Sequence, residues 1–456
     1  MHRLAYDQLS EWKNDIRRKP LLVKGVRQCG KTYAIKEFGR SNYSNVVYLN
    51  FEKDPGLNIH FEKDLDPARI VRDLSIYLGI SIRPEDTLLI FDEIQYCKPA
   101  ITSLKYFNED TPEYNIICAG SLLGIKPAES YSFPVGNVNF LDMHPMNFFE
   151  FLLANGEVIL CEHLNASGSG EISEPFASKL EEYYRHFQIV GGMPEAVSDW
   201  VLNHDIVAVE KIQGEILRTY VDDFSKHAGG EVNELMLIWR SIPQQLSKEN
   251  NRFIFSHVKK GKRARDLEHS LEWLISAGIV HKVNKITAPS IPLSAFSDET
   301  NFKLYFVDVG LLRLLSGTPA RFIFDSADLY KQFKGAMAEN YVLNELIFSG
   351  KAPFFWKSNN DAEVDFVDTF GSLIVPIEVK SDRNVRSKSL GRYVSMYGPE
   401  KAVKISLNPN ITNDGTDVRI PLWITWKINS IIGDDSVEFN KMLREKIAKT
   451  HAEEKD

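Results

Sequence analysis

The first 120 residues alternate short apolar runs with amphipathic stretches. Residues 1–19 have apolar positions at helical spacing and predict a helix that Pro20 ends. Four nearly continuous apolar runs predict strands that are buried on both faces, at residues 21–25, 45–52, 87–93 and 115–121. A helical pattern, KTYAIKEFGR, separates the first two runs. Strands that alternate with helices indicate a parallel sheet in an α/β domain.

The second half of the chain has a different pattern. Residues 155–175 contain clusters of Gly, Ser and Asn and predict a linker or long loop. Residues 176–230 predict helices, and residues 231–285 predict several helices followed by a short hairpin. A second α/β stretch begins near residue 331, with the helix GAMAENYVLNELIF and the strands FFWKS, EVDFVDT and LIVPIEVKS. The last twenty residues are charged and predict a helix that frays into a solvated tail.

Composition restricts the classes of protein that need to be considered. The 456 residues are 43% hydrophobic and 25% charged, as in ordinary globular proteins of several domains. The net charge of -8 means that any nucleic-acid contact must come from a local basic patch. The four cysteines have no zinc-site spacing, and no apolar run is long enough for a signal peptide or membrane span. We expect a cytoplasmic protein without membrane contact.

Residues 25–32 (GVRQCGKT) match the P-loop pattern G-x-x-x-x-G-K-[ST] between an apolar strand and a helical segment. Glycines let the backbone curl so that successive N–H groups point at phosphate oxygens. We expect Lys31 to reach the β- and γ-phosphates and Thr32 to ligate Mg²⁺. The predicted phosphate-binding residues are Gly25, Val26, Arg27, Gln28, Cys29, Gly30, Lys31 and Thr32. The pattern predicts a site for ATP and Mg²⁺.

Two further strand ends belong to the same predicted site. Asp92 and Glu93 follow four apolar residues, and carboxylates at the end of a buried strand are costly unless charge is needed there. We expect Asp92 to hold Mg²⁺, directly or through water, and Glu93 to polarise the attacking water. Ser121 ends the next strand, where it could contact the γ-phosphate or serve only as a turn or helix cap.

These motifs resemble a group of prokaryotic AAA-type ATPases in which a P-loop ATPase precedes a C-terminal domain of unknown function. The resemblance rests on GVRQCGKT, FDEIQ, AGS, SFPVGNVNFLDMHPMNFFEFL, GGMPEAV, KLYFVDVGLL and GAMAENYVLNEL, and so covers nearly the whole chain. The family commonly has Pro where this chain has Val26, and a smaller aliphatic residue where it has Cys29. AAA-type sites often take an arginine from a neighbouring subunit, so a homo-oligomer is among the expected assemblies. Arg185 and Arg218 are only candidates for such an arginine.

Residues 231–285 resemble a winged-helix unit, in which HSLEWLISAGIV is the last helix before a β-ribbon. Just before this helix lie five basic residues that could bind DNA phosphates or could be a solvated loop: Lys259, Lys260, Lys262, Arg263 and Arg265.

The C-terminal strands carry a second group of charged residues. Glu378 and Lys380 are two residues apart and share one strand face, and Asp365 lies on the preceding strand, which should pair with it as a hairpin. Two carboxylates and a lysine are what metal-assisted phosphodiester hydrolysis needs, with Asp365 and Glu378 as the metal ligands. Glu339 on a helix could complete the site, and Glu363 could replace Asp365 if the strand register differs. The bland alternative is a solvent-facing ion pair.

This arrangement resembles the PD-(D/E)XK nuclease superfamily, which implies roles for Glu339, Asp365, Glu378 and Lys380. The expected fold is therefore α/β multidomain: a P-loop AAA-type core, a helical and winged-helix middle, and a restriction-endonuclease-like end. The expected boundaries are 1–160 for the ATPase core, 176–230 for a helical lid-like region, 231–330 for the winged-helix-like region, 331–432 for the nuclease-like domain and 433–456 for the tail.

Three functions compete at this point. The chain could be an ATP-regulated nuclease acting on DNA, a non-cutting ATP switch or scaffold for DNA or protein, or a nucleotide-binding protein with very slow turnover.

Overall fold

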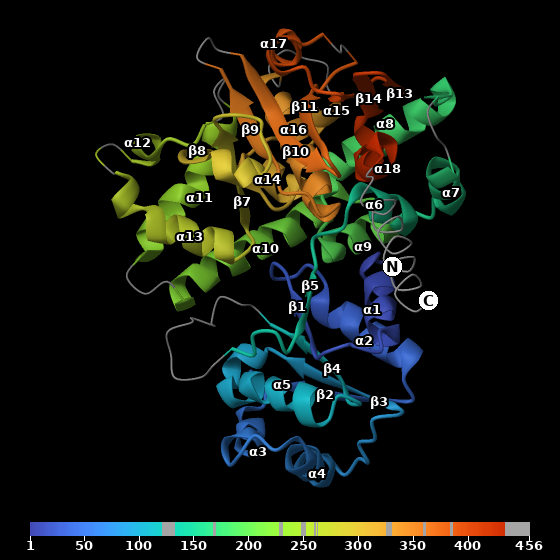
Figure 1. Ribbon diagram of the computed structural model, residues 1–456, viewed down its shortest axis with the longest axis vertical. Helices are drawn as coiled ribbons and strands as arrows, with labels where there is room; N and C mark the ends of the chain where they lie inside the picture. The colour runs from blue at the N-terminus through green and yellow to red at the C-terminus, as the bar shows by residue number, and fades with distance from the viewer. Residues whose placement is uncertain are drawn as a thin grey trace, which may run out of the picture.

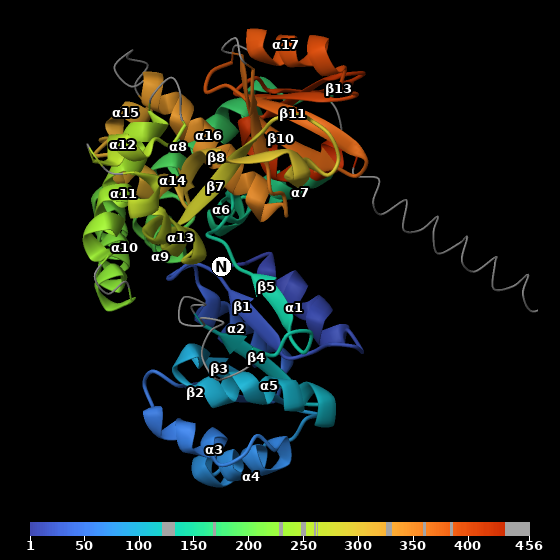
Figure 2. The same ribbon diagram turned by 60° about the vertical axis from the view of Figure 1, so that its left-hand side comes forward.

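The computed structural model describes residues 1–120, 133–166, 170–227, 231–247, 252–259, 261, 263–324, 331–358, 362–383 and 386–433. These residues form two lobes (Figures 1 and 2). The N-terminal residues build the smaller lobe around one sheet, and most of the rest of the chain builds the larger lobe around another.

The smaller lobe contains a five-stranded parallel sheet in the order β2-β3-β4-β1-β5. Its strands are β1 (Leu21–Lys24), β2 (Asn45–Asn50), β3 (Thr87–Asp92), β4 (Asn115–Ala119) and β5 (Asn139–Asp142). Its helices are α1 (Ala5–Asn14), α2 (Lys31–Asn42), α3 (Ile59–Glu62), α4 (Pro67–Leu78) and α5 (Lys98–Asp110). The predicted parallel α/β core is confirmed.

Both faces of this sheet are buried. Neighbouring residues on a strand point to opposite sides, so each strand contributes to two apolar cores. On β3, Leu88 and Ile90 belong to the apolar core that also contains residues of α1 and α2. Leu89 and Phe91 belong to a separate core with residues of α3, α4 and α5. Two-sided burial explains why the strands have continuously apolar sequences.

The chain enters the larger lobe through α6 (Phe148–Ala154) and α7 (Val158–Ala166). Asn147 and Glu150 form a capping box at the start of α6. The prediction of a linker over residues 155–175 is wrong for the first part of that range, because α7 buries Leu160, Cys161 and Leu164 on one face. The Gly- and Ser-rich composition masked this short apolar stripe.

The middle of the chain is helical, as predicted. It comprises α8 (Glu174–Val190), α9 (Pro194–Asn203), α10 (Ile206–His227), α11 (Val232–Leu246), α12 (Phe255–Val258) and α13 (Glu268–Ser276). An antiparallel hairpin follows, formed by β7 (Val280–Ile286) and β8 (Ser297–Phe306). It is longer than the predicted one, because β8 lies beyond the predicted range of residues 231–285. The winged-helix assignment stays a prediction.

The larger lobe contains a nine-stranded mixed sheet in the order β6-β13-β14-β12-β11-β10-β9-β7-β8. The remaining strands are β6 (Gly170–Glu171), β9 (Phe354–Lys357), β10 (Glu363–Phe370), β11 (Leu373–Val379), β12 (Ala402–Ser406), β13 (Asn410–Asp414) and β14 (Asp417–Pro421). The remaining helices are α14 (Val309–Leu315), α15 (Arg321–Phe324), α16 (Lys331–Phe348), α17 (Lys388–Tyr397) and α18 (Ile428–Ile432). Because β7 pairs with β9 and β8 pairs with β7, the hairpin of the middle region and the C-terminal strands share one sheet.

Within the described ranges, no helix combines the length and the apolar character needed to span a bilayer. The predicted C-terminal tail at residues 433–456 lies almost wholly outside the described residues.

Candidate functional site

The P-loop connects β1 to α2 and depends on two glycines with left-handed backbone. Gly25 has φ +150°, and a Cβ added there would lie 2.1 Å from the carbonyl oxygen of Met143. Gly30 has φ +92° and immediately precedes α2. Gln28 also has a positive φ, of 65°. These dihedrals curl the loop as the motif requires and fix the positions of its N–H groups.

Lys31 and Thr32 occupy the first turn of α2, where the helix dipole favours anions. The Lys31 ammonium donates to the carbonyl oxygens of Gly25 (2.8 Å) and Val26 (2.9 Å), so it lies over the loop. Thr32 Oγ1 lies 3.2 Å from each carboxylate oxygen of Asp92. This hydroxyl and this carboxylate are the pair expected to hold Mg²⁺, and their oxygen chemistry fits that ion.

Parallel pairing brings the carboxyl ends of the strands to one edge of the sheet. Asp92 on β3 faces Asn50 on β2 and Ala119 on β4. The Tyr48 hydroxyl donates to Asp92 Oδ2 at 2.5 Å, and Asn50 Nδ2 donates to the same oxygen at 3.3 Å. Tyr48 and Asn50 were not among the predicted site residues, although polar side chains near the end of an apolar strand were a usable signal.

Glu93 follows Asp92 with a left-handed backbone, φ 51°. Burial raises the pKa of Glu93, although the Gln95 amide opposes the shift. Gln95 Nε2 donates to Glu93 Oε2 at 2.5 Å. A raised pKa makes a carboxylate a better base near neutral pH, which suits the predicted role. Gln95 was also missed as a site residue, although it belongs to the FDEIQ block.

Ser121 lies outside the described residues. The strand that precedes it, β4, pairs directly with the P-loop strand β1.

The larger lobe contacts the P-loop from α9 and α10 and from the turn after α13. Arg27 forms an ion pair with Asp223 of α10 at 2.8 Å, and the Tyr220 hydroxyl donates to the Arg27 carbonyl at 3.1 Å. Gly30 packs near Pro194, and Gly278 packs near Val26. From the smaller lobe, Arg3 of the N-terminal segment donates to the Cys29 carbonyl and pairs with Glu150. The phosphate loop therefore lies at the junction of the lobes.

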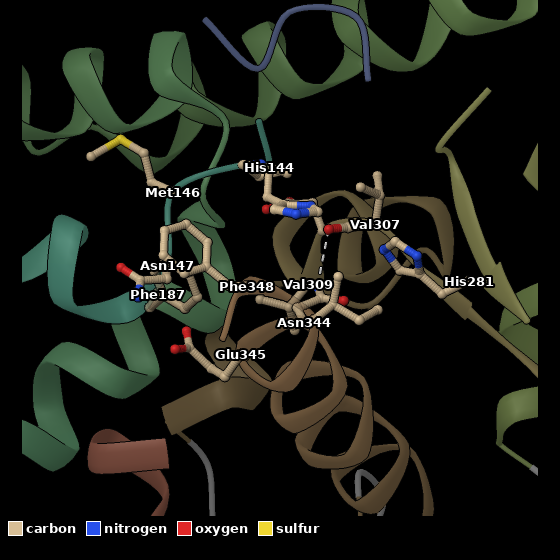
Figure 3. Close-up of a pocket in the computed structure, with 13 residues that line it drawn as sticks. His144, Met146, Asn147, Phe187, His281, Val307, Val309, Asn344, Glu345 and Phe348 are labelled. Atoms are coloured by element: carbon tan, nitrogen blue, oxygen red, sulfur yellow. Dashed lines mark hydrogen bonds between the residues drawn. The ribbon is translucent and has the colours of Figure 1, made fainter. Parts of the chain in front are cut away.

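A second part of this junction buries several titratable groups around a cavity of about 20 Å³ (Figure 3). Glu345 of α16 accepts the Phe148 N–H at 2.8 Å, and burial raises the pKa of Glu345 to about 8. Burial lowers the pKa of His281 to about 3 and also lowers the pKa of His144. These groups are therefore neutral at physiological pH, which suits a packed contact between lobes.

The C-terminal carboxylates also lie where the pattern predicts. The antiparallel register of β10 and β11, in which Phe366 faces Ile377, brings Asp365 opposite Glu378. Lys380 Nζ pairs with Glu378 Oε1 at 2.7 Å, and the Val379 N–H donates to Asp365 Oδ2 at 2.8 Å. The predicted hairpin is confirmed.

Glu339 and Glu363 lie beside this pair with other partners. Lys303 of β8 contacts Glu363 Oε1 at 2.6 Å and Glu339 Oε2 at 3.8 Å. The Tyr305 hydroxyl donates to Glu339 at 3.1 Å, and Lys357 pairs with Glu363 at 3.1 Å. Lys303 was missed, although a lone lysine within the apolar run FKLYFV was a signal.

The electrostatics divide these carboxylates into two kinds. Burial, then the charges of Glu378 and Glu339, raise the pKa of Asp365 well above its ordinary value. Burial would also raise the pKa of Glu363, but Lys303 and Lys357 outweigh it and the pKa lies below its ordinary value. Among the described residues, no three His, Cys, Asp or Glu side chains are arranged as a metal-binding cluster. The fit to a metal is therefore limited to the Asp365 and Glu378 pair.

The basic run before α13 is only partly described. Lys259, Arg263 and Arg265 are exposed to solvent. Lys260 and Lys262 lie outside the described residues. DNA contact by this run stays a prediction.

Three family models match successive parts of the chain. Residues 17–152 match an AAA domain, residues 181–321 match a domain of unknown function (DUF8612), and residues 334–424 match another domain of unknown function (DUF4143). No curated protein sequence matches the chain. Among solved structures, a Walker-type ATPase of Pyrococcus abyssi is 15% identical with a TM-score of 0.42, covering 68% of this chain and 94% of that one. Residues 17–152, which contain the curled loop and most of the parallel sheet, are thus similar to an AAA domain, and they precede two regions that match domains of unknown function.

Proposed function

We propose that the chain binds Mg²⁺-ATP in the P-loop and hydrolyses it. The observation that carries this proposal is the 3.2 Å approach of Thr32 Oγ1 to both oxygens of Asp92, next to Lys31. Thr32 and Asp92 would hold Mg²⁺, and Lys31 and the loop N–H groups would hold the phosphates. Glu93, oriented by Gln95, would take the proton of the attacking water.

The nucleotide cycle would act on the larger lobe through α10. Arg27 and its carbonyl contact Asp223 and Tyr220 on this helix. Nearer the start of α10, Glu210 pairs with Arg313 of α14 at 2.8 Å, and Arg313 is fully buried. A change in the phosphate loop can therefore reach the packed interior of the larger lobe through direct contacts.

The C-terminal module would be a metal-dependent nuclease-like site acting on DNA. Asp365 and Glu378 would bind the ion, which supplies Lewis-acid chemistry when bound. Lys380 would stabilise negative charge on the scissile phosphate. The exposed Lys259, Arg263 and Arg265 would contribute backbone contacts to DNA.

A second candidate is an ATP-dependent switch or scaffold that does not cut. It is favoured by the partners that the carboxylates already have, since Lys357 and Lys380 each pair with one of them and Lys303 contacts two. A charge cluster of this kind can stabilise a fold without binding a substrate.

One paired assay separates these functions. ATP hydrolysis and DNA cleavage with Mg²⁺ or Mn²⁺ are measured on wild type, Lys31→Ala and Asp365→Ala. Lys53→Ala, an exposed lysine of the same lobe, and Asp368→Ala, a carboxylate further along the same strand, serve as controls. We expect Lys31→Ala to lose ATP hydrolysis and Asp365→Ala to lose only cleavage. If Lys31→Ala hydrolyses ATP like wild type, the main proposal fails. If wild type hydrolyses ATP and never cuts, the second candidate holds.

A further inference from the structure

The least expected side chain in the larger lobe is Lys303, a buried lysine in the edge strand β8. Its side chain is 1% exposed and it lies between Phe302 and Leu304, which are also buried. Burying an ammonium group is costly unless opposite charges compensate it. The groups around the Lys303 ammonium should therefore indicate its role.

Lys303 meets the carboxylates of the C-terminal site from another part of the chain. Its Nζ contacts Glu363 at 2.6 Å and Glu339 at 3.8 Å, and lies 5.1 Å from the centre of the Phe355 ring. In sheet order, β7 and β9 separate β8 from the β10 strand that carries Glu363. The positive charge is thus supplied by the middle region, within the residues matched by DUF8612, to a site of the C-terminal domain.

The opposite side of the cluster retains an uncompensated oxygen. Glu378 is 4% exposed, and its Oε2 is buried without a hydrogen-bond partner, while its Oε1 pairs with Lys380. Asp365 faces Glu378 across the β10–β11 pair. A buried oxygen without a protein partner is rare, and a water molecule or a metal ion can supply the partner. Two facing carboxylate groups are suited to a hard divalent cation.

We propose that Lys303 is a built-in cation of the C-terminal site, so that the site binds a single divalent cation between Asp365 and Glu378. This inference rests on the proposed metal-binding role of that carboxylate pair. Lys303 holds the place next to Glu363 and Glu339 that a second ion would otherwise take.

The charges of the cluster support one ion over two. Four carboxylates (Glu339, Glu363, Asp365 and Glu378) face three ammonium groups (Lys303, Lys357 and Lys380), which leaves one negative charge when all are ionised. One divalent ion would change this balance to one positive charge, whereas two ions would change it to three. A second ion would therefore meet repulsion, and the place beside Glu363 is already filled.

The test is to count Mn²⁺ ions bound by the full chain without nucleotide, from the loss of the free-ion electron paramagnetic resonance signal. All variants carry Lys31→Ala, so that residual nucleotide does not hold Mn²⁺ at the P-loop. We expect one tightly bound ion in this background. Adding Lys303→Met should raise the count to two, and adding Asp365→Asn instead should reduce it to zero.

Lys357→Met is the matched control, because it removes the same charge from Glu363 but leaves Lys303 in place. It should retain a count of one. A count of zero or two in the background protein overturns the inference, and this result does not depend on whether Lys303→Met folds. An unchanged count in folded Lys303→Met, checked by circular dichroism, also overturns it. The ion count is independent of the DNA cleavage assay. A protein that binds one ion but never cuts therefore removes the nuclease proposal and leaves this inference standing.

Discussion

The ion pair between Arg27 and Asp223 should couple the phosphate loop to α10. Its N–O distance is 2.8 Å, and the two side chains are 27% and 5% exposed. Exposed pairs contribute about 0–1 kcal/mol, whereas breaking a fully buried pair costs about 3–5 kcal/mol. This half-buried pair lies between the two cases, so we expect Asp223→Asn to cost about 1–3 kcal/mol.

The assay is thermal unfolding of Asp223→Asn beside Asp222→Asn, whose carboxylate is adjacent and exposed. A loss of about 1–3 kcal/mol should lower the midpoint by a few degrees in Asp223→Asn only. A double-mutant cycle with Arg27→Ala, measured on the dissociation constant of ATP, then tests the coupling. We expect the two effects to be non-additive, because each substitution breaks the same contact.

Two results would refute this reasoning. The ion pair does not stabilise the junction if Asp223→Asn and Asp222→Asn unfold at the same temperature. The loop and α10 are energetically independent if the effects of Arg27→Ala and Asp223→Asn on ATP binding simply add.

Three further predictions concern the site and the junction. Glu93→Gln should retain ATP and slow its hydrolysis about 100-fold or more, because it removes the proposed base; unchanged steady-state turnover would exclude that role. Gly25→Ala should prevent nucleotide binding and lower the unfolding midpoint, because its methyl group would lie 2.1 Å from the Met143 carbonyl oxygen; normal ATP titration by this variant would contradict the loop geometry. Since the folded pKa of Glu345 is raised to about 8, its contribution to stability is complete below about pH 4.5 and is lost as the pH rises through 8. In wild type the urea midpoint should fall between pH 5 and 8, because each unit of pKa shift corresponds to about 1.4 kcal/mol of unfolding free energy. Glu345→Gln should flatten this fall, and an equally steep fall in the variant would be inconsistent with a buried neutral carboxyl.

The sequence alone determined the features that depend on neighbouring residues. The P-loop glycines, the apolar strands and the acidic residues after β3 follow from local backbone and burial requirements, so their spacing predicted the parallel core and the Thr32 and Asp92 pair. The Asp365 and Glu378 pairing also followed, because a tight hairpin fixes its own register.

Only the tertiary structure decided which distant groups meet. Lys303 reaches Glu363 across two intervening strands, and Asp223 reaches Arg27 from 196 positions further along the chain. No local pattern encodes such contacts, because they arise when separate apolar faces pack and bring their few buried charges together. For the same reason, β7 and β8 were not predicted to extend the C-terminal sheet. The predicted boundaries had placed them in a separate winged-helix region. The unpaired N–H and C=O groups of an edge strand can pair with the backbone of any other strand. Only the folded lobe determines which strand lies next to that edge.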